Sequence, residues 1–281
     1  MELQVLALVT FFAAAVNGAV GYGFSSLTVP IALLFFSNKV LNPALVIVAI
    51  ALNGYVLAVN RRSVPVVARR VLPVLLGLVP GIVCGGVLLA SLNSEWLKFL
   101  TYISLVPLIL LQAGGLRWPL KSERTIGLLL GAGVGTLYSA TTISGPPMAL
   151  LFNNQGLVQR DFRAAMALLR VAEAVLALVT YYALGLFNAE SLELSLWVLP
   201  SVLLGVPLGS FLINRLNAET FRRICMSYDA WIVGYGLSRV LIVLQLIASP
   251  AAYAVWLGIA AIDSYLLYVF FTRRKISQAP A

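Results

Sequence analysis

The stretch TTISGPPMALLF (residues 141–152) interrupts the helical pattern inside a strongly apolar segment of the chain. Its hydroxyl, glycine and proline residues stand where a continuous membrane helix would carry mainly apolar ones. Ser144 suits a helix N-cap, and Pro146 and Pro147 suit a first helical turn, where a backbone N–H has no acceptor within the helix. The stretch therefore predicts a short helix that begins here and points its free N–H groups and positive dipole end into the break.

Composition places this break in a membrane protein. Of the 281 residues, 61% are hydrophobic and 10% are charged, and the mean hydropathy is +0.97. Soluble domains carry about 25% charged residues. Because one membrane span needs roughly 20 residues, the length predicts one all-α polytopic unit with several spans. The start MELQ is acidic where a secretory signal peptide is basic, so we expect the N-terminal segment to be retained.

Composition also argues against several classes of site. The chain has no histidine, and Cys84 and Cys225 lie in apolar surroundings outside any ligand motif, so we predict no metal site and no cofactor. The net charge of +9 comes largely from short loops, which predicts membrane orientation rather than nucleic-acid binding. The absence of a GxxxxGK[ST] phosphate loop argues against ATP hydrolysis. We predict no enzyme, because no Ser/His, Cys/His or clustered acid pair offers a nucleophile or a metal site.

The loop charges predict how the chain is oriented. Most Lys and Arg residues lie in alternate loops, from Arg61 and Arg62 in the first to residues 273–275 in the last. The other loops carry only Lys39 and Lys98 together with acidic residues. Because basic loops remain in the cytoplasm, we predict a multi-pass protein of the inner (cytoplasmic) cell membrane with a cytoplasmic C-terminus.

Two long apolar blocks must then enter and leave the membrane on the same face. The segments 117–124 and 153–163 are both predicted to be cytoplasmic, although the apolar block 125–152 lies between them. That block is therefore predicted to be a broken hairpin. The same reasoning makes block 3–36 a hairpin entered from outside. Whether each hairpin is re-entrant or makes two full crossings is left open.

Three sequence matches indicate an internal repeat of one hairpin followed by three spans. An odd number of crossings inverts the second copy relative to the first, and inverted repeats with broken helices are a transporter architecture. We predict a first repeat over 1–116, a cytoplasmic linker at 117–124, a second, inverted repeat over 125–247, and an extra C-terminal transmembrane helix and tail over 248–281. The matches are PIALLF (30–35) with PMALLF (147–152), VLPVLLGLVP (71–80) with VLPSVLLGVP (198–207), and LNSEWLK (92–98) with LNAETFR (216–222).

The two broken hairpins predict a shared binding site. Irregular backbone is not tolerated against lipid, so both breaks must be buried in protein or line an aqueous cavity. In the first repeat, three hydroxyl residues precede Pro30 in the way that Ser144 precedes its prolines, which predicts a second half-helix start there. Two positive helix ends with hydroxyl groups would hold a small oxyanion without histidine or metal. The predicted substrate-binding residues are Asn17, Tyr22, Ser25, Ser26, Thr28, Asn53, Thr141, Thr142, Ser144, Gly145 and Arg170.

Ionisable residues within spans are costly, so each needs a partner or a function. Arg170 and Glu173 are three residues apart and can pair on one helix face. Arg170 either contacts an anion or serves only as the structural partner of Glu173, and Glu173 is the candidate for proton coupling. Aligning the repeats puts Asn53 opposite Glu173. We expect Asp229 and Asp263 to hold helices together through hydrogen bonds.

Two further groups of residues have structural expectations. Glycines in the segments 131–136 (GAGVGT), 75–81 (LLGLVPG) and 203–209 (LLGVPLG) are expected mainly to allow close helix packing. Arg239 is expected to lie toward the outer end of its helix and to extend its charged group to the membrane surface.

The glycine-rich first hairpin, the stretch TTISGPPMALLFNNQGL (141–157) and the following FRA (162–164) resemble the TauE/SafE sulfite exporter family, also called the toluene-sulfonate uptake permease family. The resemblance covers nearly the whole chain and implies a carrier of sulfite, sulfonated organic acids or similar anions. Together with the predicted site, it favours a secondary transporter (permease) for a small oxyanion, sulfite or an organosulfonate, that works by alternating access around the two broken hairpins.

Other anion-handling functions are compatible with the same residues. A half-helix end does not distinguish sulfonate from carboxylate, so a carrier of carboxylates or other organic anions is one alternative. An anion channel built on the same hairpins is another. We expect a small anionic substrate and the lipid bilayer as partners, and no nucleic acid. A coupled proton and a homodimer are left open.

Overall fold

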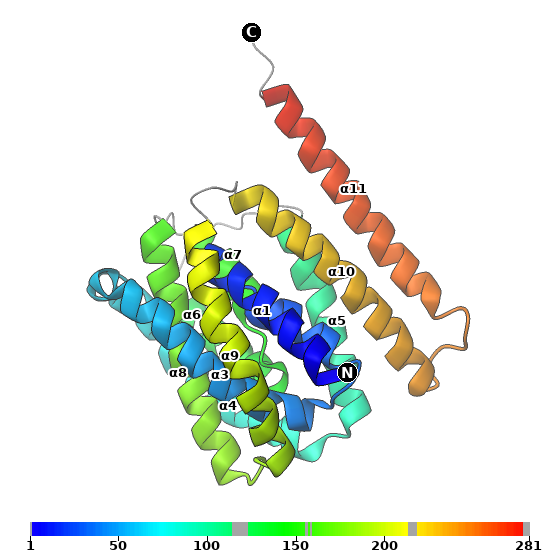
Figure 1. Ribbon diagram of the computed structural model, residues 1–281, viewed down its shortest axis with the longest axis horizontal. Helices are drawn as coiled ribbons and strands as arrows, with labels where there is room; N and C mark the ends of the chain where they lie inside the picture. Colours follow the sequence, from blue (N-terminus) through cyan, green and yellow to red (C-terminus); the bar gives the residue numbers. More distant parts are fainter. Residues whose placement is uncertain (1, 114–122, 155–156, 158, 213–217, 278–281) are drawn as a thin grey trace.

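A computed structural model describes residues 2–113, 123–154, 157, 159–212 and 218–277, and this part of the chain forms eleven α-helices, a short 3₁₀ helix η1 and no strand (Figure 1). The elements are α1 (Glu2–Val20), α2 (Phe24–Ala32), α3 (Asn38–Val59), η1 (Arg61–Ser63), α4 (Val64–Ser91), α5 (Ser94–Ala113), α6 (Glu123–Thr141), α7 (Gly145–Asn154), α8 (Gln159–Ala183), α9 (Ala189–Leu212), α10 (Ala218–Val243) and α11 (Tyr253–Ser277).

Four of these described stretches are long and apolar enough to cross a membrane. A shorter apolar stretch, Leu3–Ala19, lies in α1. The prediction of an all-helical membrane protein is thus confirmed. Most of the predicted linker at 117–124 lies outside the described residues, as does the end of the C-terminal tail. The four candidate spans are Asn38–Val59, Arg61–Ser91, Ala189–Phe211 and Tyr253–Thr272.

Both predicted helix breaks are present. α1 ends at Val20 and α2 begins at Phe24, while α6 ends at Thr141 and α7 begins at Gly145. Neither apolar block is therefore a continuous helix. α2 has nine residues and α7 has ten, so each is only about 14–15 Å long, or roughly half the thickness of the hydrocarbon core of a bilayer.

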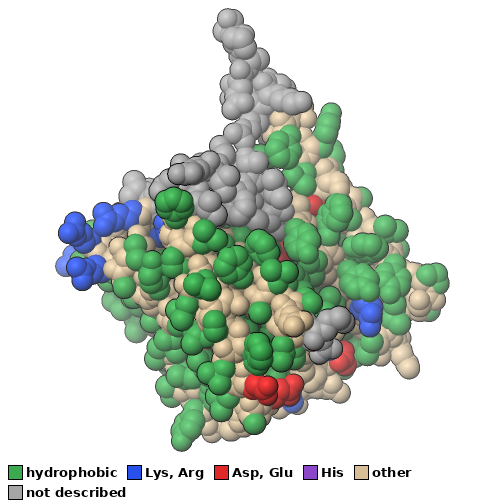
Figure 2. Space-filling model, viewed as in Figure 1, with side chains coloured by type: hydrophobic (Ala, Val, Ile, Leu, Met, Phe, Trp, Pro, Cys, Tyr) green, Lys and Arg blue, Asp and Glu red, His purple; other side chains and the backbone are tan. Residues whose placement is uncertain are grey.

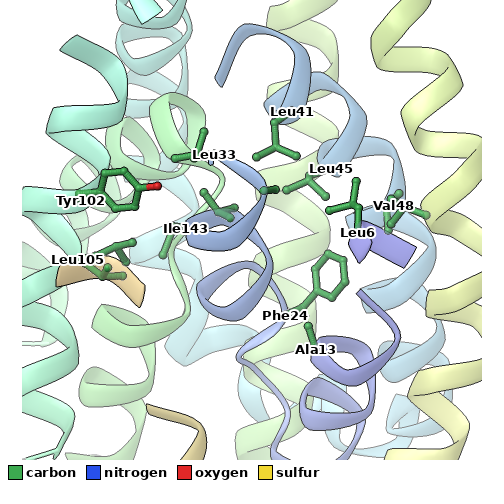
Figure 3. Packing of buried hydrophobic residues seen from close by; sticks show 14 of the residues in the cluster. Leu6, Ala13, Phe24, Leu33, Leu41, Leu45, Val48, Tyr102, Leu105 and Ile143 are labelled. Carbon is green, nitrogen blue, oxygen red and sulfur yellow. The ribbon is translucent and has the colours of Figure 1, made fainter. Parts of the chain in front are cut away.

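The first two helices form an antiparallel hairpin. Figure 3 shows Ala13 of α1 next to Phe24 at the start of α2, with Leu6 of α1 and Leu33, just after α2, both above this pair. α1 and α2 also pack against each other. The chain therefore runs in along α1, turns at the break, and returns along α2, as predicted for a hairpin.

The first break lies earlier than the pattern of prolines suggested. We predicted a helix start just before Pro30, but Pro30 lies inside α2, and the chain turns at Gly21 and Gly23. These two glycines have φ angles of +94° and +112°, a region that other residues rarely adopt. The chain thus reverses where glycine permits it, and Ser25 and Ser26 lie in the first turn of α2 rather than ahead of it.

The second break follows the prediction. Ser144 directly precedes α7, and Pro146 and Pro147 occupy the first turn of that helix. The N–H of Met148 donates to the carbonyl oxygen of Ser144 at 3.2 Å, which is the first bond of the helix. Thr142 has a φ of 58° and makes the turn that glycine makes in the first break.

The two halves of the chain pack reciprocally. α1 of the first half packs along α9 of the second, and α6 of the second half packs along α4 of the first. In the same way α3 packs against α8, and α5 packs against α10. Each hairpin therefore contacts the equivalent helix of the other half, which is the pattern that two related repeats produce. The inverted relation between them stays a prediction.

Glycines let these helices approach closely. A Cβ added to Gly77, Gly81 or Gly85 of α4 would overlap a carbonyl oxygen of α6. A Cβ added to Gly205 or Gly209 of α9 would overlap a carbonyl oxygen of α1. The predicted packing role of the glycine segments is therefore confirmed at both reciprocal contacts.

α11 lies at the edge of the bundle and packs on α10 and α5 (Figure 1). Only 11% of its apolar span is buried, so most of that span is available to lipid. Ser227 of α10 donates a hydrogen bond of 3.1 Å to Oδ1 of Asp263 on α11. Asp263 thus holds two helices together as expected, and Asp229 is buried in α10.

Charge is distributed unevenly between the two ends of the bundle. Figure 2 shows a group of Lys and Arg side chains at the left, over the junction of α3 and α4, whereas acidic and basic side chains lie together toward the lower right. Arg61 and Arg62 lie at that junction, in η1. This group of basic residues agrees with the orientation predicted from the loops, and which end is cytoplasmic stays a prediction.

Candidate functional site

The two helix breaks meet beside α8. Gly145, the first residue of α7, lies against Tyr22 of the first break, because a Cβ added to Gly145 would be 3.4 Å from Cδ2 of Tyr22. The same Cβ would be 3.1 Å from Nη1 of Arg170 on α8. α7 therefore begins next to the first break, and both half-helix starts lie around one point.

α8 supplies a charged residue to each half-helix start. Arg170 Nη2 donates a hydrogen bond of 3.0 Å to the hydroxyl of Ser25 at the start of α2. Ser144, at the start of α7, donates a hydrogen bond of 2.5 Å to Oε2 of Glu173. All four side chains are buried, with exposed fractions of 3% or less. Arg170 and Glu173 lie in the middle turns of this 25-residue helix, so the site is deep within the bundle.

Arg170 and Glu173 do not form the ion pair that their spacing allows. Within the described part of the chain, the only Lys or Arg nitrogen within 4.0 Å of a carboxylate belongs to Lys98, which pairs with Glu95. The two side chains of α8 instead bind serines of different hairpins. The site is therefore held together by three separate segments of the chain rather than by one helix face.

Several polar atoms around the breaks are buried without a hydrogen-bond partner in the described structure. They include Nε of Arg170, Oε1 of Glu173, the hydroxyl of Tyr138 and both amide atoms of Asn17. Most buried polar groups in native proteins have a partner, so these atoms are available to bind water or a polar ligand.

Tyr138 is a site residue that our reading of the sequence missed. It lies close enough to interact electrostatically with Arg170 and Glu173. The carbonyl oxygen of Tyr138 accepts from the N–H of Thr142 in the second break, just as that of Asn17 accepts from Gly21 in the first. Tyr138 thus occupies the place in α6 that Asn17 occupies in α1. An alignment centred on the breaks would have found it.

The electrostatic balance of the site favours an anion. The first N–H groups of α2 and α7 have no acceptor within their own helices, and each helix start carries a partial positive charge. The N-cap Gly23 of α2 offers no side-chain oxygen to these groups. The positive charge of the two helix ends and the Arg170 guanidinium therefore exceeds the negative charge of the Glu173 carboxyl group.

The remaining predicted residues are buried, but the described contacts do not join them to the charged pair. Thr141 and Thr142 bond within the second break, where Thr141 donates to Leu137 at 2.6 Å and Thr142 to the carbonyl of Thr141 at 2.7 Å. Asn53 of α3 donates to Ala49 one turn earlier at 2.8 Å. Ser26 and Thr28 lie in α2 beyond Ser25.

Two side chains hold the helix ends that precede the breaks. Arg163 of α8 donates to the carbonyl of Gly18 at 2.7 Å and to Ser210 of α9 at 3.3 Å. Asn42 of α3 donates to the carbonyl of Ala140 at 2.7 Å. Each bond fixes the last turn before a break to a central helix of the other half. Arg163 belongs to the FRA segment, which carried part of the family resemblance without a role of its own.

Comparison with known proteins places these features in a family. A family model described as "Sulfite exporter TauE/SafE" matches residues 6–235, which include both broken hairpins and all of α8. Neither a curated protein nor a solved structure matches the chain.

Proposed function

The chain belongs to the TauE/SafE sulfite exporter family of membrane transporters, and on this premise we propose that it is a secondary transporter of a small oxyanion, either sulfite or an organosulfonate. The observation that carries the proposal is the pair of serine contacts on α8. Ser25 with Arg170 and Ser144 with Glu173 bring both half-helix starts to one buried point.

A sulfite or sulfonate group matches the donors at this point. It presents three oxygen atoms, and the donors around the breaks are the Arg170 guanidinium, the serine hydroxyls and the backbone N–H groups at the helix starts. A guanidinium can donate to two oxygens at once. An oxygen of the substrate would accept the Arg170 N–H hydrogen bond that the Ser25 hydroxyl accepts in this structure. The Ser25 hydroxyl would then be free to donate a hydrogen bond to the substrate.

Glu173 links anion binding to a proton. While Glu173 is ionised, it accepts the hydrogen of the Ser144 hydroxyl and so withdraws that donor from the substrate. When Glu173 takes up a proton, its carboxyl group becomes a donor and the Ser144 hydroxyl is free to turn to the anion. Anion and proton therefore favour each other's binding, as reciprocal linkage requires.

The way in which the hairpins are attached supports alternating access as the mechanism. Both half-helix starts are bound to α8, so a shift of either hairpin against α8 would open the site from one side while the other side stays closed. An inside-negative potential favours exit of a monovalent anion by about 2.3 kcal/mol per 100 mV, so export needs no coupled ion. Uptake would need one, and the proton on Glu173 would supply it.

A binding panel on the purified protein tests the proposal. Sulfite, sulfate, sulfoacetate, taurine, aryl sulfonates and dicarboxylates would be ranked by the rise in unfolding temperature that each produces. We expect sulfite or a sulfonate to rank first, and this rise to be much smaller in the Ser144→Ala and Arg170→Ala variants. A top rank for dicarboxylates would favour the carboxylate carrier, and no stabilisation by any anion would contradict the proposal.

A further inference from the structure

A cavity lies away from the breaks, between α5, α10 and the residues that follow α2. Its volume is about 260 Å³. Leu33 and Phe35, which follow α2, form part of its wall, and Lys98 of α5 and Arg239 of α10 line it. Pockets for drug-sized ligands begin at about 300 Å³, so this cavity suits a smaller molecule.

The charged groups of this cavity favour an anion. Lys98 and Arg239 are its cations and Glu95 is its acid, which leaves a net charge of +1. Glu95 accepts a hydrogen bond from Lys98 at 3.2 Å through one oxygen. A Lys ammonium has three donors and an Arg guanidinium has five, so donors remain for a ligand. Glu95 and Lys98 lie at the beginning of α5, and a helix start adds positive partial charge.

The cavity is connected to the broken hairpin through Tyr102. Its side chain lines the cavity and points from α5 toward α2 (Figure 3), where its hydroxyl donates to the carbonyl oxygen of Pro30 at 3.0 Å. The N–H of Leu34, the usual helical partner of that carbonyl, bonds to Ile31 instead. The residues that follow α2 therefore form part of the cavity wall, and the start of α2 carries Ser25 of the central site.

We propose that this cavity is a second anion site, which takes the same small oxyanion as the central site and lies at the mouth of its path. The inference rests on the proposed function. Lys98 and Arg239 would raise the local concentration of anions at this end of the bundle. In the orientation predicted from the loop charges, this end faces the outside, so the cavity would receive the anion on release or offer it for uptake.

Binding stoichiometry tests the second site directly. Isothermal titration of the full chain in zwitterionic nanodiscs, with sulfite and sulfoacetate as probes, should give two binding events per chain. We expect the Lys98→Gln/Arg239→Gln double variant to lose one event and Ser144→Ala to lose the other. The apparent KM for transport from the cavity side should rise at least tenfold in the double variant, while the event assigned to the central site keeps its affinity.

Lys39→Gln is the matched control. Lys39 is a basic residue at the beginning of α3 that donates to the carbonyl of Ala90 at 3.2 Å and does not line the cavity. It should retain both events. One event in the wild type, or two in the double variant, would overturn the second site while leaving the central one standing, whereas no event at all would remove both. Loss of the second event in nanodiscs that contain phosphatidylglycerol would assign the cavity to an anionic lipid headgroup and also overturn the proposal.

Discussion

Ser144 donates a hydrogen bond of 2.5 Å to Glu173, and this contact joins the start of a half-helix to the one carboxyl group that the described residues place where the two breaks meet. One turn earlier on α8, Arg170 makes the corresponding contact with Ser25 of the other hairpin. The start of α2 thus contacts a basic residue of α8, and the start of α7 contacts an acidic one. Removing any one of these four side chains should affect one hairpin more than the other.

Ser144→Ala should weaken binding of the best anion by about tenfold or more. Hydrogen bonds to charged groups contribute roughly 1.5–3 kcal/mol, and the variant removes the hydroxyl that serves both Glu173 and the substrate. The dissociation constant measured by titration checks this. Ser227→Ala is the matched control, because it removes a buried serine bond to Asp263 at the contact between α10 and α11, away from the breaks. Equal losses in the two variants would contradict a specific role for Ser144.

Glu173→Gln should separate proton coupling from anion binding. Glutamine keeps an oxygen that can accept from Ser144, but it cannot take up a proton. In the wild type, anion affinity should fall as pH rises, because Glu173 loses its proton and again accepts the Ser144 hydroxyl. In the variant this pH dependence should vanish. Titrations at several pH values, with vesicle assays of uptake driven by a pH gradient and of counterflow exchange, measure the effect. Uptake should be lost and exchange should survive, whereas unchanged uptake would remove Glu173 from coupling.

Arg170→Gln should abolish anion binding at the central site, and Arg170→Lys should restore only part of it. Lysine keeps the charge but lacks the planar fork of donors that can contact Ser25 and an anion together. Dissociation constants for the three proteins, with unfolding temperatures to confirm that each is folded, provide the test. Equal affinity in the lysine and wild-type proteins would mean that charge alone is needed.

The position of the second break could be predicted because its signals are local. Ser144 and the two prolines after it define a helix start without reference to the rest of the chain. The first break was misplaced because Pro30 gave a similar signal, whereas the turn depends on Gly21 and Gly23. A proline near the end of a nine-residue helix and one at its beginning are hard to distinguish from spacing alone.

The contacts within the site could not be predicted. Ser25 and Arg170 are 145 residues apart, and their meeting depends on where the fold places the start of α2 relative to α8. The spacing of Arg170 and Glu173 suggested an ion pair, because only contacts within one helix can be inferred from sequence. Tyr138 was missed for a related reason. In the sequence, a tyrosine in an apolar helix is expected to pack in the core, and only the fold places it near Arg170 and Glu173.

Arg163→Gln and Asn42→Ala should open the site from opposite faces. Each removes a bond to the last turn before a break, Arg163 to Gly18 of α1 and Asn42 to Ala140 of α6. A bond of this kind is worth about 1.4 kcal/mol or more, and its loss should raise the open population about tenfold. The readout is the labelling rate of Ser26→Cys by a membrane-impermeant thiol reagent, with Cys84 and Cys225 replaced by serine. Faster labelling of both variants from the same face would contradict the assignment.

Gly81→Ala should lower the unfolding temperature, whereas Gly133→Ala should leave it unchanged or raise it slightly. A Cβ at Gly81 would overlap the carbonyl oxygen of Ala132, so α4 and α6 would have to move apart, and forcing extra volume into a packed contact costs about 1–3 kcal/mol. Gly133 has nothing within 4 Å of an added Cβ, so alanine there brings only its better helix propensity, which is worth up to about 1 kcal/mol. Thermal unfolding in detergent compares the two variants under identical conditions. Because α1 packs on α9 in the same manner, Gly209→Ala should behave like Gly81→Ala, and a Gly209 variant as stable as the wild type would show that the two reciprocal contacts are not equivalent.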